Sequence, residues 1–130
     1  MTCFWDNIMN SLSHEDYNLL GFDNKPNSTS FITKLKEKNT EIQTLWQGMP
    51  LSTQEKKEHS QAIQTYNIST ISNGHLTSTC DSFLLLLCQL LNLDIHHNYL
   101  QLTTIIYSQH NKNPRKTLKF QSTRTHFSTQ

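Results

Sequence analysis

The segment that most constrains the fold is the apolar run from Phe83 to Leu93, the longest in the chain, which only Gln89 and Asn92 interrupt. It is too short to cross a membrane, which takes about 20 apolar residues. The helix predicted over Asp81–Leu91 is apolar nearly all round, so it belongs at the centre of a core, and we expect no membrane partner. The positions expected to be buried are Leu84, Leu87, Cys88 and Leu91.

The segments after this helix alternate apolar and polar residues, as strands with one buried face do. These strands are predicted over residues 93–96, 103–107 and 117–121, with a further strand-like run at 124–128. The front half of the chain shows helical spacing instead. Helices first, then a buried helix packed on a small and mostly antiparallel sheet, indicate an α+β fold. At 130 residues, the chain is expected to form a single domain over 1–130.

The front half carries recognisable helix starts. Apolar spacing predicts a helix over Cys3–Leu12, and Ser13 with Asp16 has the pattern of a capping box for a second helix that Gly21 ends. Phe31, Ile32 and Leu35 predict a third helix, up to Asn39. A short helix capped by Thr40 is expected to carry Ile42, Leu45 and Trp46. The capping box from Ser52 to Glu55 starts a polar helix that runs to about Tyr66.

The composition excludes several classes of function. The net charge is +1 and charged residues make up 16% of the chain, with no polybasic run, so nucleic-acid binding has no electrostatic support. Asp6 and Asn7 interrupt the first apolar residues, which argues against a signal peptide. Cys3, Cys80 and Cys88 cannot all pair with one another, so we expect reduced thiols in the cytoplasm.

The residues with the strongest chemical interest stand near the two ends of the chain. Cys3 opens the first predicted helix, where the helix N-terminus favours a thiolate, and His126 lies on the last predicted strand, which would hold an imidazole rigidly. A thiol and an imidazole in these settings are what a cysteine hydrolase needs. Taken alone, Cys3 also fits a half-buried helical cysteine, and His126 fits an exposed histidine at a strand end.

A metal site is not expected. Cys80 and Cys88 are eight residues apart, whereas zinc ligands usually come as close pairs such as Cys-x-x-Cys. His75, His96 and His97 lie nearby in the sequence, but neighbouring residues of a strand point to opposite faces, so His96 and His97 could not easily bind one ion. No pattern in the chain points to a cofactor.

A resemblance to a known family rests on the C-terminal half and on the first helix. Residues 78–95 are predicted to form an apolar helix that runs straight into a strand, followed by Thr104-Ile105-Ile106-Tyr107, Thr117-Leu118-Lys119-Phe120 and Thr125-His126-Phe127. The N-terminal Cys3-Phe4-Trp5-Asp6-Asn7-Ile8 has an aromatic residue after the cysteine and an apolar residue five positions on. Together these resemble the ovarian-tumour (OTU) family of cysteine proteases, most closely the small OTU-like proteins of large DNA viruses that infect protists.

The resemblance implies a function and a site. Cys3 would be the nucleophile, His126 its general base, Ser128 an orienting group, and the backbone N–H groups of Cys3 and Thr2 the oxyanion donors. The substrate would be an isopeptide or peptide bond at the C-terminus of ubiquitin or a ubiquitin-like protein, cut in the cytoplasm, in a host cell if the protein is viral, or in a virion. Ser128 stands where the family often has Asn or Asp, and Met1 and Thr2 do not form the family's Asp-Gly-x stretch. The alternative is therefore a catalytically degenerate OTU-like scaffold with a binding or virion-associated role.

Overall fold

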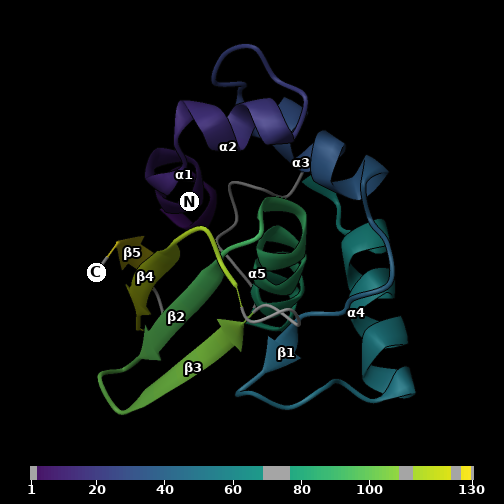
Figure 1. The fold of residues 1–130 in the computed structure, drawn as a ribbon, viewed down its shortest axis with the longest axis vertical. Helices are drawn as coiled ribbons and strands as arrows, with labels where there is room; N and C mark the ends of the chain where they lie inside the picture. Colours follow the sequence, from purple (N-terminus) through teal and green to yellow (C-terminus); the bar gives the residue numbers. More distant parts are fainter. Residues whose placement is uncertain (1–2, 69–76, 109–112, 124–126, 130) are drawn as a thin grey trace.

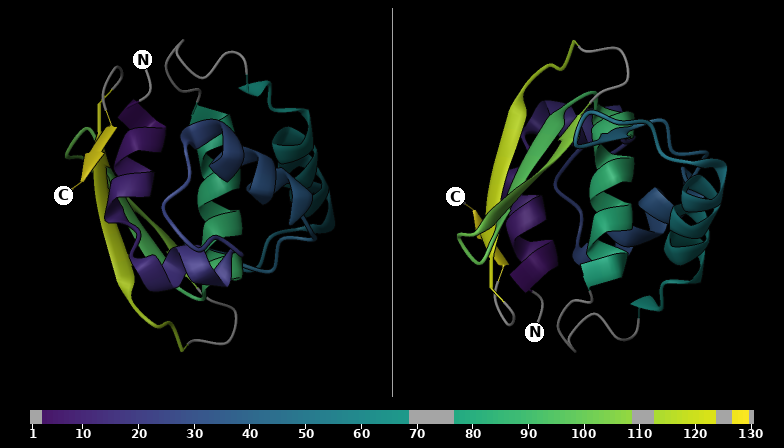
Figure 2. Two further views of the ribbon diagram at one scale, coloured as in Figure 1. Left: turned by 90° about the horizontal axis from the view of Figure 1, so that it is seen from above. Right: turned by 90° about the horizontal axis from the view of Figure 1, so that it is seen from below.

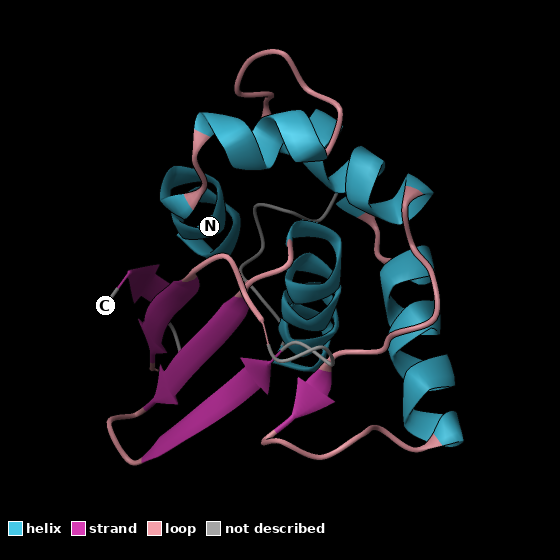
Figure 3. Cartoon of the chain, in the orientation of Figure 1, coloured by secondary structure: helices cyan, strands magenta, loops and turns pink. Residues whose placement is uncertain are grey.

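The computed structural model describes residues 3–68, 77–108, 113–123 and 127–129, with the backbone alone at positions 3, 77–80, 127 and 128 (Figures 1 and 3). Its helices are α1 (Cys3–Ser11), α2 (His14–Leu19), α3 (Ser28–Glu37), α4 (Thr53–Thr65) and α5 (Thr77–Leu91). Its strands are β1 (Leu45–Trp46), β2 (Asp94–Tyr99), β3 (Thr103–Ser108), β4 (Thr117–Ser122) and β5 (Phe127–Thr129). The predicted α+β class is confirmed.

The strands form one sheet in the order β1-β3-β2-β4-β5. Three of the four neighbouring pairs are antiparallel and the remaining pair, β2 with β4, is parallel, so the prediction of a mostly antiparallel sheet is right. The hairpin between β2 and β3 turns through Leu100 and Gln101, whose φ angles are 57° and 59°. Two successive positive φ angles match the right-handed twist of the strands that they join.

Helix α5 is the centre of the core, as its sequence predicts. Leu84, Leu87, Cys88 and Leu91 are each at most 1% exposed. The helix lies between the sheet and α4, and α1 lies beside it on the same face of the sheet (Figure 2). In the described part of the chain, none of the helices combines the length and the hydropathy that a membrane crossing takes.

The described helices cover one face of the sheet. In β2, the side chains of Ile95 and His97 point into the core and are buried, whereas His96 is half-buried on the other side of the strand. The predicted division of His96 and His97 between two faces is therefore confirmed. In Figure 2 the described helices all lie on one side of the sheet, which fits the alternating pattern from which the strands were predicted.

The predicted short helix at Ile42–Trp46 is wrong. Leu45 and Trp46 form β1, which pairs with Ser108 and Tyr107 of β3. An isolated helix of one or two turns is unstable by itself, whereas β3 offers an open edge with backbone partners. The pairing also places the Trp46 ring edge-on to Tyr107, with centroids 5.2 Å apart. A tertiary partner far along the chain thus overrides the local pattern.

The helix boundaries follow the capping signals. Ser13 with Asp16, and Ser52 with Glu55, both form complete capping boxes, and Gly21, with a φ of +98°, follows the end of α2. Some boundaries differ from their predictions, as at the end of α3, which is Glu37 rather than Asn39. Helix α5 starts at Thr77 rather than Asp81, so the end of the predicted polar loop 69–79 is helical, and residues 69–76 lie outside the described residues.

Candidate active site

The structure describes some of the predicted site residues and not others. Cys3 is the first residue of α1, at the helix start where the sequence places it, and Ser128 is the middle residue of β5. Thr2 and His126 lie outside the described residues, and the side chains of Cys3 and Ser128 do as well. The described parts of this site are α1, which begins at Cys3, and β5, which contains Ser128.

Helix α1 and strand β5 lie side by side, although they are the first and last elements of the chain (Figure 2). Asn7 of α1 joins them, because its Oδ1 accepts hydrogen bonds from the backbone N–H and the Oγ1 hydroxyl of Thr129, at 3.1 and 3.2 Å. In both views of Figure 2, β5 begins at the end of the molecule where α1 begins. The helix that starts at Cys3 thus meets the strand that directly follows His126.

The start of α1 is held firmly in the core. Phe4 and Trp5 are each 3% exposed, and Trp5 packs edge-on against the rings of Phe31 and Phe83. The Trp5 Nε1–H also donates to the Tyr66 hydroxyl at 3.0 Å. A buried indole usually needs such a partner, and here it fixes the rotation of the helix. The rotation of α1 about its own axis is therefore fixed.

Sequence reasoning did not find Asn7. Its only local signal is its position, since Asn is a weak helix former and stands in the middle of an otherwise well-patterned helix. Its partner Thr129 is 122 residues away in the chain, beyond the reach of any periodicity. The signal that could have identified Asn7 is a polar amide side chain in a helix interior, where asparagine is not favoured.

A buried histidine–serine pair lies on the core side of the sheet, between β2 and β4. The Nε2 atom of His97 is 2.6 Å from the Oγ of Ser122, and the two residues are 5% and 6% exposed. Ser122 is also the register partner of Phe127, the first residue of β5. The pair thus links β2 to β4, and β4 in turn pairs with β5.

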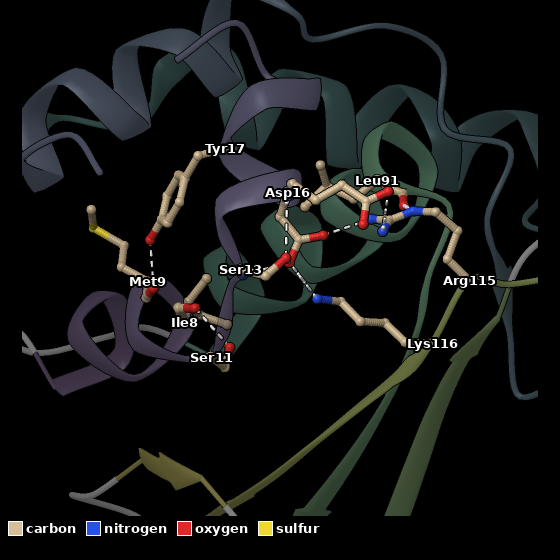
Figure 4. A network of polar contacts seen from close by, with 10 residues as sticks. Ile8, Met9, Ser11, Ser13, Asp16, Tyr17, Leu91, Arg115 and Lys116 are labelled. Atoms are coloured by element: carbon tan, nitrogen blue, oxygen red, sulfur yellow. Dashed lines mark hydrogen bonds and ion pairs between the residues drawn. The ribbon is translucent and has the colours of Figure 1, made fainter. Parts of the chain in front are cut away.

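Among the described residues, the largest cluster of charged side chains links separate elements of the fold (Figure 4). The carboxylate of Asp16 is fully buried, accepts from Arg115 Nη2 at 2.6 Å and from Lys116 Nζ, and also accepts from the Ser13 backbone N–H at 2.8 Å. Arg115 Nε donates to the Leu91 carbonyl at 2.8 Å. The cluster joins α2 to the end of α5 and the start of β4, so its charges are satisfied within the protein.

The pKa values in this cluster follow from its contacts. Burial alone would raise the pKa of Asp16, but the hydrogen bonds from Arg115, Lys116 and Ser13 outweigh it and leave that pKa below its ordinary value. Burial, together with the charge of Asp16, raises the pKa of Tyr17 to about 12. The Tyr17 hydroxyl donates to the Met9 carbonyl of α1, as Figure 4 shows. Both groups therefore keep one protonation state near neutral pH and act structurally.

A second set of polar contacts anchors the start of α5. The Tyr107 hydroxyl donates to Asp81 Oδ1 at 2.5 Å, and His59 Nδ1 lies 2.8 Å from Ser82 Oγ. Burial raises the pKa of Asp81, an effect that the hydrogen bond from Tyr107 partly offsets, and burial lowers the pKa of His59. These contacts fasten α5 to β3 and α4, consistent with a structural role.

Cys88 is not a candidate nucleophile. It is fully buried, its Sγ–H donates to the Tyr107 carbonyl at 3.7 Å, and burial raises the pKa of its thiol well above the ordinary value. A buried thiol with a raised pKa is inert. Within the described residues, no three His, Cys, Asp or Glu side chains gather in a way that could hold a metal ion.

No family model, curated protein or solved structure matches this chain. The functional assignment therefore depends on the chemistry of the residues and on how the fold arranges the elements that carry them.

Proposed function

We propose that the protein is an OTU-like cysteine protease, a deubiquitinase that hydrolyses isopeptide or peptide bonds at the C-terminus of ubiquitin or a ubiquitin-like protein. Cys3 is the nucleophile, His126 is the general base and Ser128 orients the imidazole. The protein acts in the cytoplasm, in that of a host cell if it is viral, or within a virion.

The observation that carries this proposal is the contact between α1 and β5. Thr129 of β5 is hydrogen-bonded to Asn7, which follows Cys3 by about one helical turn. His126 precedes Thr129 by three residues, and three residues of extended chain span about 10 Å at most. Cys3 and His126 lie near opposite ends of the sequence. Each is thus only a few residues from the hydrogen-bonded pair of Asn7 and Thr129.

The chemistry of each element suits its role. The N-terminus of α1 stabilises a thiolate at Cys3, because the unpaired N–H groups there carry partial positive charge. The imidazole of His126 would take the thiol proton and later protonate the leaving amine. The backbone N–H groups of Cys3 and Thr2 are the candidate oxyanion donors. In a low-dielectric site, one such donor is worth about 10²- to 10³-fold in rate.

A second candidate function is a non-enzymatic OTU-like scaffold that binds ubiquitin or a virion component. The observation in its favour is Ser128, which occupies the position where the family often has Asn or Asp. A serine hydroxyl is a weaker partner for an imidazolium than a carboxylate, because it carries no negative charge to stabilise the positive charge of the ring. The two functions differ in whether Cys3 reacts.

Covalent labelling distinguishes the two functions. Ubiquitin with an electrophile at its C-terminus is expected to form an adduct with the wild-type chain, which intact mass and peptide mapping would locate at Cys3. Cys3→Ala should abolish the adduct, whereas Cys80→Ala, the matched control, should leave it unchanged. A folded wild-type chain that gives no adduct with ubiquitin or ubiquitin-like probes would favour the scaffold. An adduct that survives Cys3→Ala would place the nucleophile elsewhere.

A further inference from the structure

We propose that Asn7 is a positioning residue, which holds β5 at a fixed height along α1 and thereby sets the alignment of Cys3 with His126. This inference rests on the proposed function and adds a residue to it that the family resemblance does not supply.

The contact is a two-donor clamp on a single oxygen. Asn7 Oδ1 accepts from the Thr129 backbone N–H at 3.1 Å and from its Oγ1 hydroxyl at 3.2 Å. A carbonyl oxygen has two lone pairs, so one amide can satisfy both donors. Because one of the donors is backbone, the clamp fixes the path of the strand itself as well as one of its side chains.

Strand β5 needs such a clamp because it is short and lies at the edge of the sheet. It has three residues and pairs with β4 alone, through Phe120–Thr129, Gln121–Ser128 and Ser122–Phe127. Short edge strands open at low free-energy cost. The register partner of Thr129, Phe120, is fully buried. Thr129 is therefore held between a core strand and Asn7, and these two contacts fix β5 from both sides.

The clamp lies close to both predicted catalytic residues along the chain. Cys3 is four residues from Asn7, a rise of about 6 Å in a helix, and His126 is three residues from Thr129. A misplacement of about 1 Å between reacting groups can lower a rate by about 100-fold. Loosening the clamp would let β5 shift relative to α1, so catalysis should fall more than binding does.

Four single variants of the full chain, and the double variant Asn7→Ala/Thr129→Val, test the clamp. Asn7→Ala removes the acceptor, and Thr129→Val removes the hydroxyl donor but keeps the backbone N–H. Thr129→Ser keeps both donors and should behave as wild type. Asn10→Ala is the matched control, because Asn10 is in the same helix, is exposed, and accepts instead from Lys25 Nζ at 2.6 Å. Circular dichroism establishes that each variant is folded at the assay temperature.

Two readouts are measured on each variant, namely the kcat and KM of a ubiquitin–fluorophore substrate and the exchange rate of the Thr129 amide by NMR. Asn7→Ala is expected to lower kcat by about 10- to 100-fold and to change KM by less than about twofold. It should also speed exchange of the Thr129 amide by about tenfold. Thr129→Val should give a smaller loss of kcat. The double variant should lose no more than Asn7→Ala alone, because both changes break one contact.

The outcomes separate this inference from the proposed function. If the wild type turns over and Asn7→Ala matches Asn10→Ala in kcat, the positioning role is overturned while the protease function stands. A fall in kcat with unchanged Thr129 exchange would overturn the clamp as its cause. If the wild type does not turn over, the proposed function fails. The exchange rate of the Thr129 amide then tests by itself whether Asn7 holds β5. Unchanged exchange in Asn7→Ala would overturn that role.

Discussion

Replacement of His126 by alanine is expected to lower the turnover of a ubiquitin–fluorophore substrate by about 10²- to 10⁴-fold, the range over which a positioned general base acts. The loss should appear in kcat, because the imidazole acts on the thiol proton and on the leaving amine rather than on ubiquitin binding. The measurement is steady-state kinetics of the wild type and the variant at matched protein concentration.

His14→Ala is the control for this loss. His14 is an exposed histidine at the start of α2, so its replacement removes one imidazole without touching the α1–β5 junction. It should retain wild-type turnover. If His126→Ala kept more than about a third of the wild-type kcat, a general base could not be assigned to this residue.

The second large effect concerns stability. Leu87→Ala is expected to lower the free energy of unfolding by about 2–5 kcal/mol, because Leu87 is 1% exposed in the most buried helix and its truncation leaves a cavity. Urea denaturation followed by circular dichroism measures the change. The m-value should stay the same, which would show that the denatured state is not altered.

Leu102→Ala is the matched control for Leu87→Ala. Leu102 is 84% exposed beside the turn that joins β2 to β3, so the same truncation there should cost less than about 0.5 kcal/mol. A cost below about 1 kcal/mol at Leu87 would contradict the central position of α5.

Local patterns predicted most of the helices and the buried strands. Ser13 and Ser52 predict the starts of α2 and α4, and the apolar run after Asp81 predicts α5. These features are predictable because capping and burial patterns depend on residues that are close in the sequence. Strand β1 was missed because its stability comes from β3, about 60 residues further along the chain. The Asp16–Arg115 ion pair was missed for the same reason, because its partners are 99 positions apart in the sequence.

The candidate site also contains one part that could be predicted from the sequence and one part that could not. Cys3 at a helix start could be predicted from the spacing of Phe4, Ile8 and Leu12, and α1 begins there. Asn7 could not, because its role depends on Thr129, which only the folded chain brings near. The pairing of Cys3 with His126 stays a prediction. The contact between α1 and β5 supports it, because α1 begins at Cys3 and β5 directly follows His126.

The measurement that tests the central proposal most directly is the distance from Cys3 Sγ to the nearer ring nitrogen of His126 in a crystal structure of the chain. The proposal predicts hydrogen-bonding distance, about 3 Å, or slightly more in an empty site. A separation above about 7 Å, with both side chains ordered and α1 and β5 in contact, would contradict the nucleophile–base pair.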